Sequence, residues 1–582
     1  MFVKVIRVRN KEYVNIVKSY WDKESKSCKH KVVQNLGLLS KLEENDPNFL
    51  ENLRNEFKKY SKDKEEKEVL LGRMLGTFKD VLSDDNVDGE YDIRDENKIH
   101  NKYQNELEVL NYGNLILNNV YRKLDLDKYF EKSKSMKRIK YDLNNIVQNL
   151  VAMRFLKPCS KSKTFNIFNE YTIKNDDTLK SIYRSLEILC DERLDIIEHI
   201  NKKLAELFDR NLKETFYDVT TVYFESIEKN DLLDYGFSKD AKINNVQVVL
   251  GMMIDAYGIP IAYKLFAGNT CDFKTFIPFI KEVKEKLGIE NITVIADRGL
   301  NSGPNLLELK KDGFEFIMSH KIKGNKNLVP GIIDLATYEQ AAEGFYVKKA
   351  PLTKKIKDEL GLDNSLDGNL ILSFSEKRRK KDQSDRERLI KKAKSCVEKN
   401  GSKAMSELKK GGKKYVNYSV GEISLNEEKI IDDARWDGFY GIYTSNKNLS
   451  IETVIRTYSN LWKIEESFRI LKTTFETRPV YLSKEKTIEG HFMICYLALV
   501  IERFIEFSLS SLANNSLTTD RIVDALRKVK IVLIESLDKK EKYFLRVREP
   551  EDYTNLRESL GYQIIPKWGK VDELGPVLLE SK

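Results

Sequence analysis

Three acidic residues have sequence contexts that favour chemistry over simple hydration: Asp218, Asp297 and Glu465. Asp218 interrupts a strand-like apolar run, where an unpaired carboxylate would be costly to bury. Asp297 directly follows a second apolar run, in the segment VIADRG. Carboxylate oxygens are the hard donors that Mg²⁺ or Mn²⁺ prefers, and two such ions ~4 Å apart can activate a nucleophile and stabilise a leaving oxygen. Each acid alone could be a surface or capping residue, so the prediction depends on their meeting in space.

The segment 458–472 carries Glu465 and has the period of a helix with two faces. Positions i, i+4, i+7, i+11 and i+14 share one stripe, which holds Tyr458, Trp462, Glu465, Arg469 and Lys472. An adjacent stripe is apolar and can bury, namely Leu461, Ile464, Phe468, Leu471 and Phe475. One carboxylate therefore stands among two cations and two aromatic rings on a face that the core does not need. Such a face suits a metal ion beside a nucleic-acid backbone.

The elements that must position these acids begin within residues 211–324. Three meandering strands come first, then a helix, a strand, a helix and a strand, at 216–224, 246–254, 259–266, 275–287, 291–296, 304–311 and 314–319. This is the order of a ribonuclease-H-like core in an α/β fold, and the segment 458–472 supplies its missing final helix. The first and fourth strands of such a core are neighbours. Asp218 and Asp297 would therefore meet, and the helix would add Glu465.

A long insertion at residues 325–445 separates the two parts of the predicted core. It begins with a basic stretch that contains the run EKRRKK at 376–381 and a Lys-rich helix at about 385–394. It then becomes β-rich, with strand-like segments at 415–418 and 438–444. The final helices of the core are expected at 446–515, where an apolar run predicts a buried helix too short to span a bilayer. A helical C-terminal region is expected at 516–582.

The N-terminal third predicts two further regions. Residues 1–45 alternate in the manner of strands, which favours a small β region. Residues 46–210 are mainly helical, apart from a polar linker at about 83–97, and predict a DNA-end-binding domain. The basic residues of this domain either neutralise phosphates or form an ordinary solvated surface; they are Lys132, Lys134, Lys137, Arg138, Lys140, Arg154, Lys157, Lys161 and Lys163.

The composition sets broad limits on function. The chain has 582 residues, 41% hydrophobic and 33% charged, which is the balance of a globular protein with three or four domains. A formal net charge of +9 favours a polyanionic partner without proving one. The six cysteines form no CxxC pair, so neither a zinc ribbon nor a disulfide framework is indicated. The N-terminus lacks the apolar core of a signal peptide, and we expect a cytoplasmic protein with no membrane partner.

Taken together, these segments resemble the DDE transposases of bacterial insertion sequences, in the group with the helix signature Y-x-x-R-x-x-x-E-x-x-x-x-x-x-K and a β-rich insertion. Tyr458, Glu465 and Lys472 match the tyrosine, glutamate and lysine at the proper intervals. Leu461 stands at the arginine position, a departure for which either Arg456 or Arg469 would compensate or one phosphate contact would be absent. Other segments match as well, among them YDVTT at 217–221, DRG at 297–299, WDGFY at 436–440 and RPVY at 478–481. The resemblance covers about residues 100–510.

The resemblance implies a reaction and roles for these residues. Asp218, Asp297 and Glu465 would hold two Mg²⁺ ions, with Mn²⁺ able to substitute, and an activated water would cut one DNA strand at the element's end. The released 3′-hydroxyl would then attack the opposite strand or target DNA. The partners would be double-stranded terminal inverted repeats and target DNA, bound by a homodimer in the bacterial nucleoid. DNA contacts would come from Tyr458, Lys472, Arg298, Arg469, Trp462 and Tyr440.

Alternatives remain open at this stage. Tyr440 would stack a flipped base, or it would pack in the core as aromatic residues of apolar strands usually do. A metal-dependent nuclease of the same fold would lack strand transfer, and a DNA-binding protein derived from a transposase would lack catalysis altogether. The presence of all three acids counts against the last of these. Inverted repeats that flank the gene would favour an active mobile element.

Overall fold

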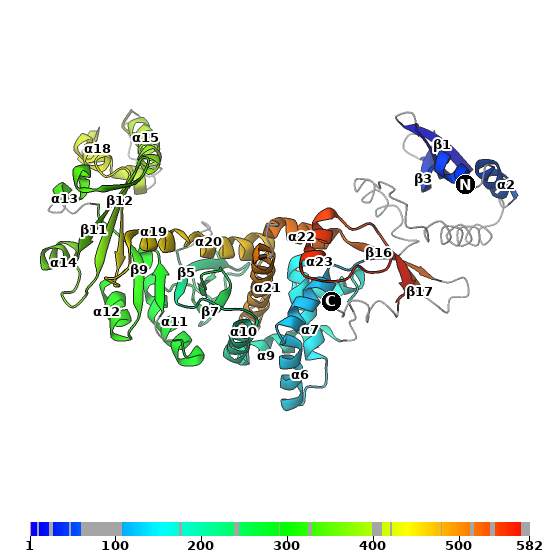
Figure 1. Cartoon of the computed structure of the whole chain (residues 1–582), viewed down its shortest axis with the longest axis horizontal. Helices are drawn as coiled ribbons and strands as arrows, with labels where there is room; N and C mark the ends of the chain where they lie inside the picture. The colour runs from blue at the N-terminus through cyan, green and yellow to red at the C-terminus, as the bar shows by residue number, and fades with distance from the viewer. Residues whose placement is uncertain are drawn as a thin grey trace. The chain divides into compact units, whose positions relative to one another are not determined.

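A computed structural model describes the chain at residues 2–8, 11–22, 27–45, 48–59, 108–173, 177–237, 244–289, 292–323, 329–398, 410–419, 422–478, 480–511, 517–535 and 542–571. The chain divides into two compact units (Figure 1). The smaller unit comprises residues 1–110, 530–548 and 564–580, and the larger comprises residues 111–529 and 549–563. The expected linker at 83–97 lies outside the described residues.

The smaller unit contains a three-stranded sheet and a four-stranded sheet. Strands β1 (Phe2–Val8), β2 (Lys11–Asp22) and β3 (Ser27–Leu38) form a meander, which confirms the strand pattern read in the first residues. Helices α1 (Leu39–Asn45) and α2 (Phe49–Lys59) pack apolar residues against this meander.

The second sheet of this unit corrects the expectation of a helical C-terminal region. Its order is β18 (Trp568–Lys570), β17 (Lys542–Arg546), β16 (Lys530–Glu535) and β4 (Glu108–Asn111). Only α22 (Thr519–Lys528) and α23 (Glu551–Ser559) are helical there among the described residues. The segment KIVLIE is too short an apolar run for its period to distinguish a strand from a helix.

The larger unit is built on a mixed sheet of nine strands, in the order β10-β11-β12-β15-β9-β8-β5-β6-β7. Its central strands are β5 (Glu214–Tyr223), β6 (Gln247–Ile254), β7 (Pro260–Ala267), β8 (Thr293–Ala296) and β9 (Glu315–His320). Each strand starts and ends within about two residues of the predicted one. Strand β8 pairs in parallel with both β5 and β9, whereas β6 and β7 are antiparallel. The connections are α11 (Asp272–Leu287) and α12 (Gly303–Lys311), as predicted. This mixed α/β arrangement is consistent with a ribonuclease-H-like core.

The insertion contributes strands to the same sheet, of which the sequence predicted only the one at 438–444. β10 (Glu339–Ala342), β11 (Phe345–Pro351), β12 (Asn369–Ser375) and β15 (Phe439–Thr444) extend the sheet beyond β9. Helix α14 (Lys354–Leu360) follows β11, and the long α15 (Glu376–Glu398) follows β12 directly. β13 (Val416–Ser419) and β14 (Glu422–Leu425) form a separate hairpin before α18 (Glu427–Ala434).

A helical block adjoins the β7 side of the sheet. It contains α5 (Asn114–Lys123), α6 (Leu126–Met136), α7 (Leu143–Leu156), α8 (Lys161–Asn166), α9 (Leu179–Asp191), α10 (Arg193–Leu207) and α21 (Glu485–Ser511). Helix α21 packs against α7, α9 and β7, and the residues at 492–501 are buried, which confirms the predicted internal helix. No described helix is long and apolar enough to cross a membrane.

Candidate active site

Asp218 and Asp297 lie on neighbouring strands. Strands β5 and β8 pair in parallel, with Tyr217 opposite Ala296, so Asp218 and Asp297 occupy the next position of the same register. Tyr217 faces α11, because its hydroxyl donates to Thr275 Oγ1 at 2.9 Å and its ring contacts two phenylalanines of that helix. Side chains alternate along a strand, so Asp218 faces the opposite side of the sheet.

The helix that carries Glu465 crosses that opposite side. Helix α20 (Trp462–Arg469) packs against β5 and β6, and Figure 1 shows it on the other face of these strands from α11. Glu465 is exposed, and Trp462 retains 56% of its surface. The predicted apolar stripe is buried as expected, at Leu461, Ile464, Phe468, Leu471 and Phe475.

The segment 458–472 is not one continuous helix, which corrects the prediction. Helix α19 (Ile451–Ser459) ends just before Asn460, and both Asn460 and Leu461 donate backbone hydrogen bonds to the third residue before them. Helix α20 then begins, and a π-helical turn, η4 (Ile470–Thr474), follows it. Tyr458 and Glu465 therefore belong to different helical segments.

Tyr458 contacts the insertion through Tyr440. The hydroxyl oxygens of Tyr458 and Tyr440 are 2.9 Å apart, and the guanidinium of Arg378 lies 4.2 Å from the centre of the Tyr440 ring. Burial raises the pKa of the Tyr458 phenol far above its usual value, and the charges of Tyr440 and then Asp297 add to that increase. Tyr458 therefore stays neutral and can donate a hydrogen bond next to Asp297.

Asp297 and Arg298 form the turn that follows β8. The Asp297 carboxylate accepts a hydrogen bond of 2.6 Å from the backbone N–H of Arg298, which starts a short 3₁₀ helix. The Arg298 side chain is exposed, and no described carboxylate forms an ion pair with it.

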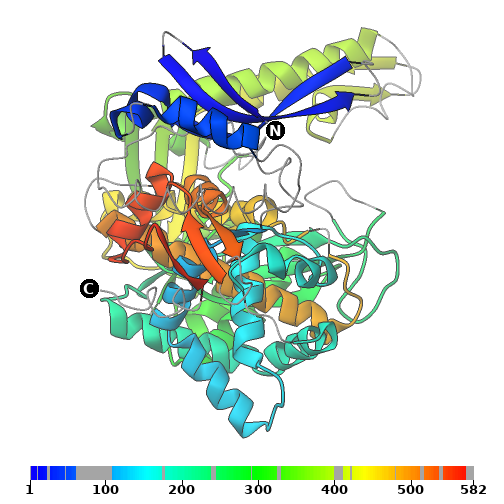
Figure 2. The ribbon, with the colours of Figure 1, turned by 90° about the vertical axis from the view of Figure 1, so that its right-hand side faces the viewer.

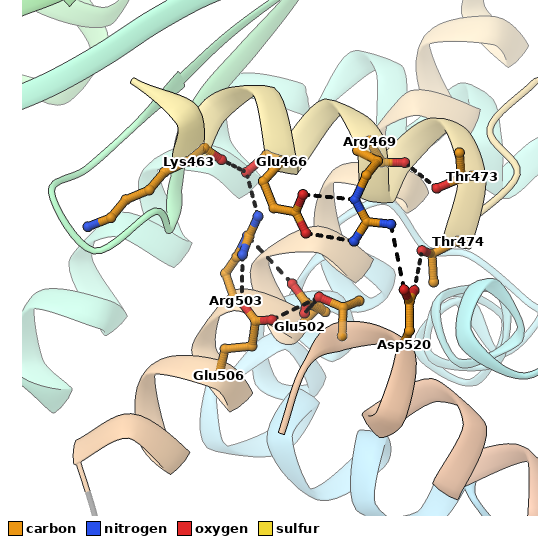
Figure 3. Close-up of polar contacts among 11 residues, drawn as sticks. Lys463, Glu466, Arg469, Thr473, Thr474, Glu502, Arg503, Glu506 and Asp520 are labelled. Atoms are coloured by element: carbon orange, nitrogen blue, oxygen red, sulfur yellow. Dashed lines mark hydrogen bonds and ion pairs between the residues drawn. The ribbon is translucent and has the colours of Figure 1, made fainter. Parts of the chain in front are cut away.

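A network of charged residues connects α20 to the elements around it (Figure 3). Glu466 forms a bidentate pair with Arg469 at 2.6 and 2.8 Å, and Arg469 also lies 3.7 Å from Asp520 at the start of α22. Lys463 donates to the Ala256 carbonyl at 2.6 Å, in the turn between β6 and β7. These pairs occupy the Arg469 guanidinium, which the sequence assigned to DNA.

Buried acids on α21 complete this network. Arg503 donates to Ser467 Oγ of α20 at 3.2 Å and pairs with Glu506 at 2.5 Å. Glu502 is fully buried, and Thr519 Oγ1 lies 2.6 Å from it and 2.8 Å from Glu506. Burial raises the pKa of Glu502, and the Glu506 charge raises it further. The Thr519 hydroxyl has a single proton, so a protonated Glu502 supplies the second hydrogen bond.

Part of the predicted basic patch is structural. Arg154 and Lys161 are only 2% and 4% exposed. Arg154 donates to the carbonyls of Phe475 and Cys159, and Lys161 Nζ lies 3.0 Å from His491 Nδ1. These two residues therefore join α7 to the Phe475 carbonyl and α8 to His491 of α21, and their burial keeps them from DNA phosphates.

Other members of the patch are already paired. Lys134, Lys137 and Lys157 form ion pairs with acids of the same helical block. The remaining ones are exposed and have no ion pair with a described carboxylate: Lys132, Arg138, Lys140 and Lys163. The patch is thus smaller than the sequence indicated.

In the segment WDGFY that matched the family, Trp436 is buried and Phe439 is half-buried against Phe374. Lys472 is half-buried in the π-helical turn. No three His, Cys, Asp or Glu side chains of the described residues lie together as a group that could hold a metal ion.

Sequence reasoning missed two groups of residues that support the site. Arg378 was read only as part of a charge run, and nothing local marks it as the partner of Tyr440. Glu502 and Arg503 lie in an apolar helix, where charged residues flanked by Leu, Val and Ile are a signal of buried pairing. That signal was available in the sequence.

Three comparisons relate the chain to known proteins. Residues 215–501 match the family model described as "Transposase DDE domain". The search of curated proteins gave no match. Among solved structures, the chain matches a piggyBac transposase synaptic complex with hairpin DNA at 10% identity and a TM-score of 0.32, over 71% of this chain and 79% of that one. It also matches a Mos1 transposase paired-end complex with the left transposon end at 11% identity and a TM-score of 0.14, over 29% of this chain and 76% of that one. The family match carries the conclusion that the chain contains a transposase DDE domain over residues 215–501.

Proposed function

We propose that the protein is a DNA transposase, which cuts the ends of an insertion sequence by metal-dependent hydrolysis and joins the 3′-hydroxyls to target DNA. The observation that carries the proposal is the register position shared by Asp218 and Asp297, on the face that the helix of Glu465 crosses. The match of residues 215–501 to transposase DDE domains supports it. Two ends must be cut together, so the active form in this proposal is a homodimer on paired ends.

The three carboxylates fit a divalent metal by donor type, because hard oxygen ligands suit Mg²⁺ or Mn²⁺. Asp218 and Asp297 start from adjacent strands, and Glu465 is exposed on α20, the helix that packs against β5. Metal bound there would lower the pKa of a water molecule and neutralise charge on the scissile phosphate. These three acids are therefore the proposed ligands.

The neighbouring residues would orient the DNA. Tyr458 is a neutral donor beside Asp297 and would hold a phosphate oxygen. Arg298 is exposed next to Asp297 and would add a fixed positive charge, with Lys472 as a second. Trp462 presents an exposed ring, and a flipped base would stack on the face of Tyr440 that Arg378 does not cover. We assign Arg469 to holding α20.

Incubation of the purified protein with DNA that spans the borders of its own gene tests the proposal. In Mg²⁺, strand cleavage and joined products should appear on denaturing gels; nicks without joining would indicate a nuclease. Asp218→Asn, Asp297→Asn and Glu465→Gln should each lower cleavage at least ~100-fold, a loss on the scale of one catalytic group. Binding to the ends should change little.

A matched control separates a catalytic role from a general charge effect. Glu285 is an exposed acid on α11, on the other side of the sheet. Glu285→Gln should cleave as the wild type does. If each of the three site variants lost end binding together with cleavage, the acids would have a structural role and the proposal would fail. Ca²⁺ should support binding but little cleavage, because its coordination is looser.

A further inference from the structure

Helix α15 gathers its lysines on one face. The helix contains ten Lys and Arg residues against five Asp and Glu. At about 100° per residue, its exposed lysines fall within an arc of roughly 160°; this lysine face consists of Lys377, Lys380, Lys381, Lys391, Lys392 and Lys394. None of these six forms an ion pair with a described carboxylate. The acids Glu376, Glu387 and Glu398 fall within the same arc, so the face holds both signs but is positive in net charge.

The opposite side of α15 anchors the helix. Ala393 and Cys396 are buried there, and Ala393 packs in a cluster with Tyr415 and Val416. Arg386 forms an ion pair with Asp437, and the Asp382 carboxylate accepts a hydrogen bond from the Gly438 backbone N–H at 3.0 Å. Because these contacts fix the helix from behind, the lysine face keeps one orientation.

The start of α15 lies close to the proposed active site. α15 follows β12, and β12 pairs with β15 so that Ser373 lies opposite Tyr440. Tyr440 and Ser373 therefore lie at the end of the sheet where the carboxyl ends of β8 and β9 also lie. Arg378, one residue after Lys377, covers Tyr440, which contacts Tyr458 beside Asp297. The start of α15 therefore lies at the same end of the sheet as the proposed catalytic acids of β5 and β8.

The order of the sheet determines which DNA would reach α15. The helical block packs on β7 at one side, and α15 continues from β12 on the other, with β5 and β8 between them (Figures 1 and 2). Residues 46–210, which include helices α5 to α10 of this block, are the predicted DNA-end-binding domain, and we take them to bind the terminal repeat. DNA that passes the acids of β5 and β8 would then continue toward α15.

We propose that the lysine face of α15 binds the backbone of the flanking duplex, the DNA just outside the scissile phosphate. This inference rests on the proposed function. The lysine face spans residues 377–394, about 26 Å of helix, or roughly eight base-pair steps. Backbone contacts of this kind position the duplex and carry no sequence information, which suits flanking DNA that differs at each insertion site.

The test uses two duplexes from the borders of the gene. Both contain the terminal repeat, but one carries about 20 base pairs of flank and the other ends at the scissile phosphate. The variant K380Q/K381Q/K391Q removes three charges of the lysine face. The matched control K311Q/K354Q/K355Q removes three exposed lysines that form no ion pair with a described carboxylate. These lysines lie at the opposite end of the strands from the start of α15.

The wild type and the control should bind the flanked duplex more tightly than the trimmed one. The variant should prefer the flanked duplex less than the wild type does, and its salt slope on that duplex should fall by up to about 2.7, since each phosphate contact contributes about 0.9. Binding to the trimmed duplex and the thermal midpoint should stay at wild-type values.

Two results would overturn the inference. If the variant kept the wild-type preference for the flanked duplex, the lysine face would not contact DNA. If it lost affinity equally on both duplexes, α15 would contact the repeat and not the flank. Failure of the proposed function has a separate signature, because the wild type would then neither bind nor cut the terminal repeat in either duplex.

Discussion

Replacing Lys161 with methionine should remove a pH dependence of folding stability above neutrality. Lys161 lies on α8 with its ammonium nitrogen 3.0 Å from His491 Nδ1, and only 4% of the residue is exposed. Burial lowers the pKa of Lys161 to about 7, and the positive charge of Arg154 contributes to the decrease. The unfolded chain returns this lysine to its ordinary pKa near 10.4.

The sign follows from the protons bound in each state. Below about pH 7 the lysine is charged in both states, so its burial penalty is fully present. Between about pH 7 and 10.4 the unfolded state holds one more proton than the folded state, so stability rises with pH by up to about 1.4 kcal/mol per unit. From pH 7.5 to 9.0 the expected gain is about 2 kcal/mol.

His491 should not mask this gain. Burial lowers the pKa of His491 well below its usual value, with Lys161 and Arg154 adding to the effect, so the ring is neutral throughout this range. A neutral ring also fits its contacts, because Nε2 lies 3.3 Å from the Thr477 carbonyl and Nδ1 faces Lys161. Nε2 therefore donates and Nδ1 accepts.

Urea denaturation at pH 7.5, 8.2 and 9.0, followed by tryptophan fluorescence, measures the slope. The wild type should become more stable with pH, and Lys161→Met should lose most of that increase. Lys163→Met changes an exposed lysine of the same helix and should keep the wild-type slope. Equal slopes in wild type and Lys161→Met would refute the assignment of a neutral, buried lysine. The slope is the quantity to compare, because loss of the hydrogen bond to His491 shifts absolute stability as well.

Three further substitutions test residues on or around α20, the helix that carries Glu465. Glu502→Gln should fold and should lose less stability at high pH than the wild type. The raised pKa of Glu502 stabilises the folded wild type at low pH, and this contribution is lost as the pH rises through the pKa of Glu502 in the folded state. Urea midpoints at pH 5 and 9 measure the difference. Tyr458→Phe removes the contact with Tyr440 and should cost about 1 kcal/mol of stability while slowing cleavage in Mg²⁺, which chemical denaturation and a cleavage time course would separate. Glu466→Gln breaks a partly exposed pair with Arg469 and should change stability by less than about 1 kcal/mol with cleavage retained, in contrast to Glu465→Gln, which should lose cleavage with stability unchanged.

The central strands could be predicted because their signals are local. β5 to β9 are apolar runs bounded by turn residues, and Asp255 to Gly258 closes the β6–β7 hairpin as its sequence indicated. β10 and β11 gave no such signal, since EQAA and FYVKKAP are short, partly polar and largely exposed. Their place in the sheet comes from pairing with β12 and, through it, β15. No periodicity along the chain reports a pairing between distant segments.

For the segment 458–472, the buried face was predicted correctly, but the single continuous helix was not. The apolar stripe is buried as predicted, because a helix in a protein is stabilised mainly by packing of that stripe. The break at Asn460 and Leu461 preserves the same face while tightening the turn. Hydrophobic spacing therefore located Glu465 correctly but gave no information on the turn that separates it from Tyr458.

Charge is where the sequence and the structure differ most. In the helical block, Arg154 and Lys161 are buried by partners more than 300 residues away, so the predicted DNA surface loses two of its cations to packing. In α15, apolar residues and Asp437 anchor one side and leave the lysine face exposed. Composition alone weights all these cations equally, but only exposed ones without acid partners can replace the counterions of a phosphate backbone. The fold therefore shifts the expected DNA contacts from the helical block toward the insertion, next to the acids that would cut the strand.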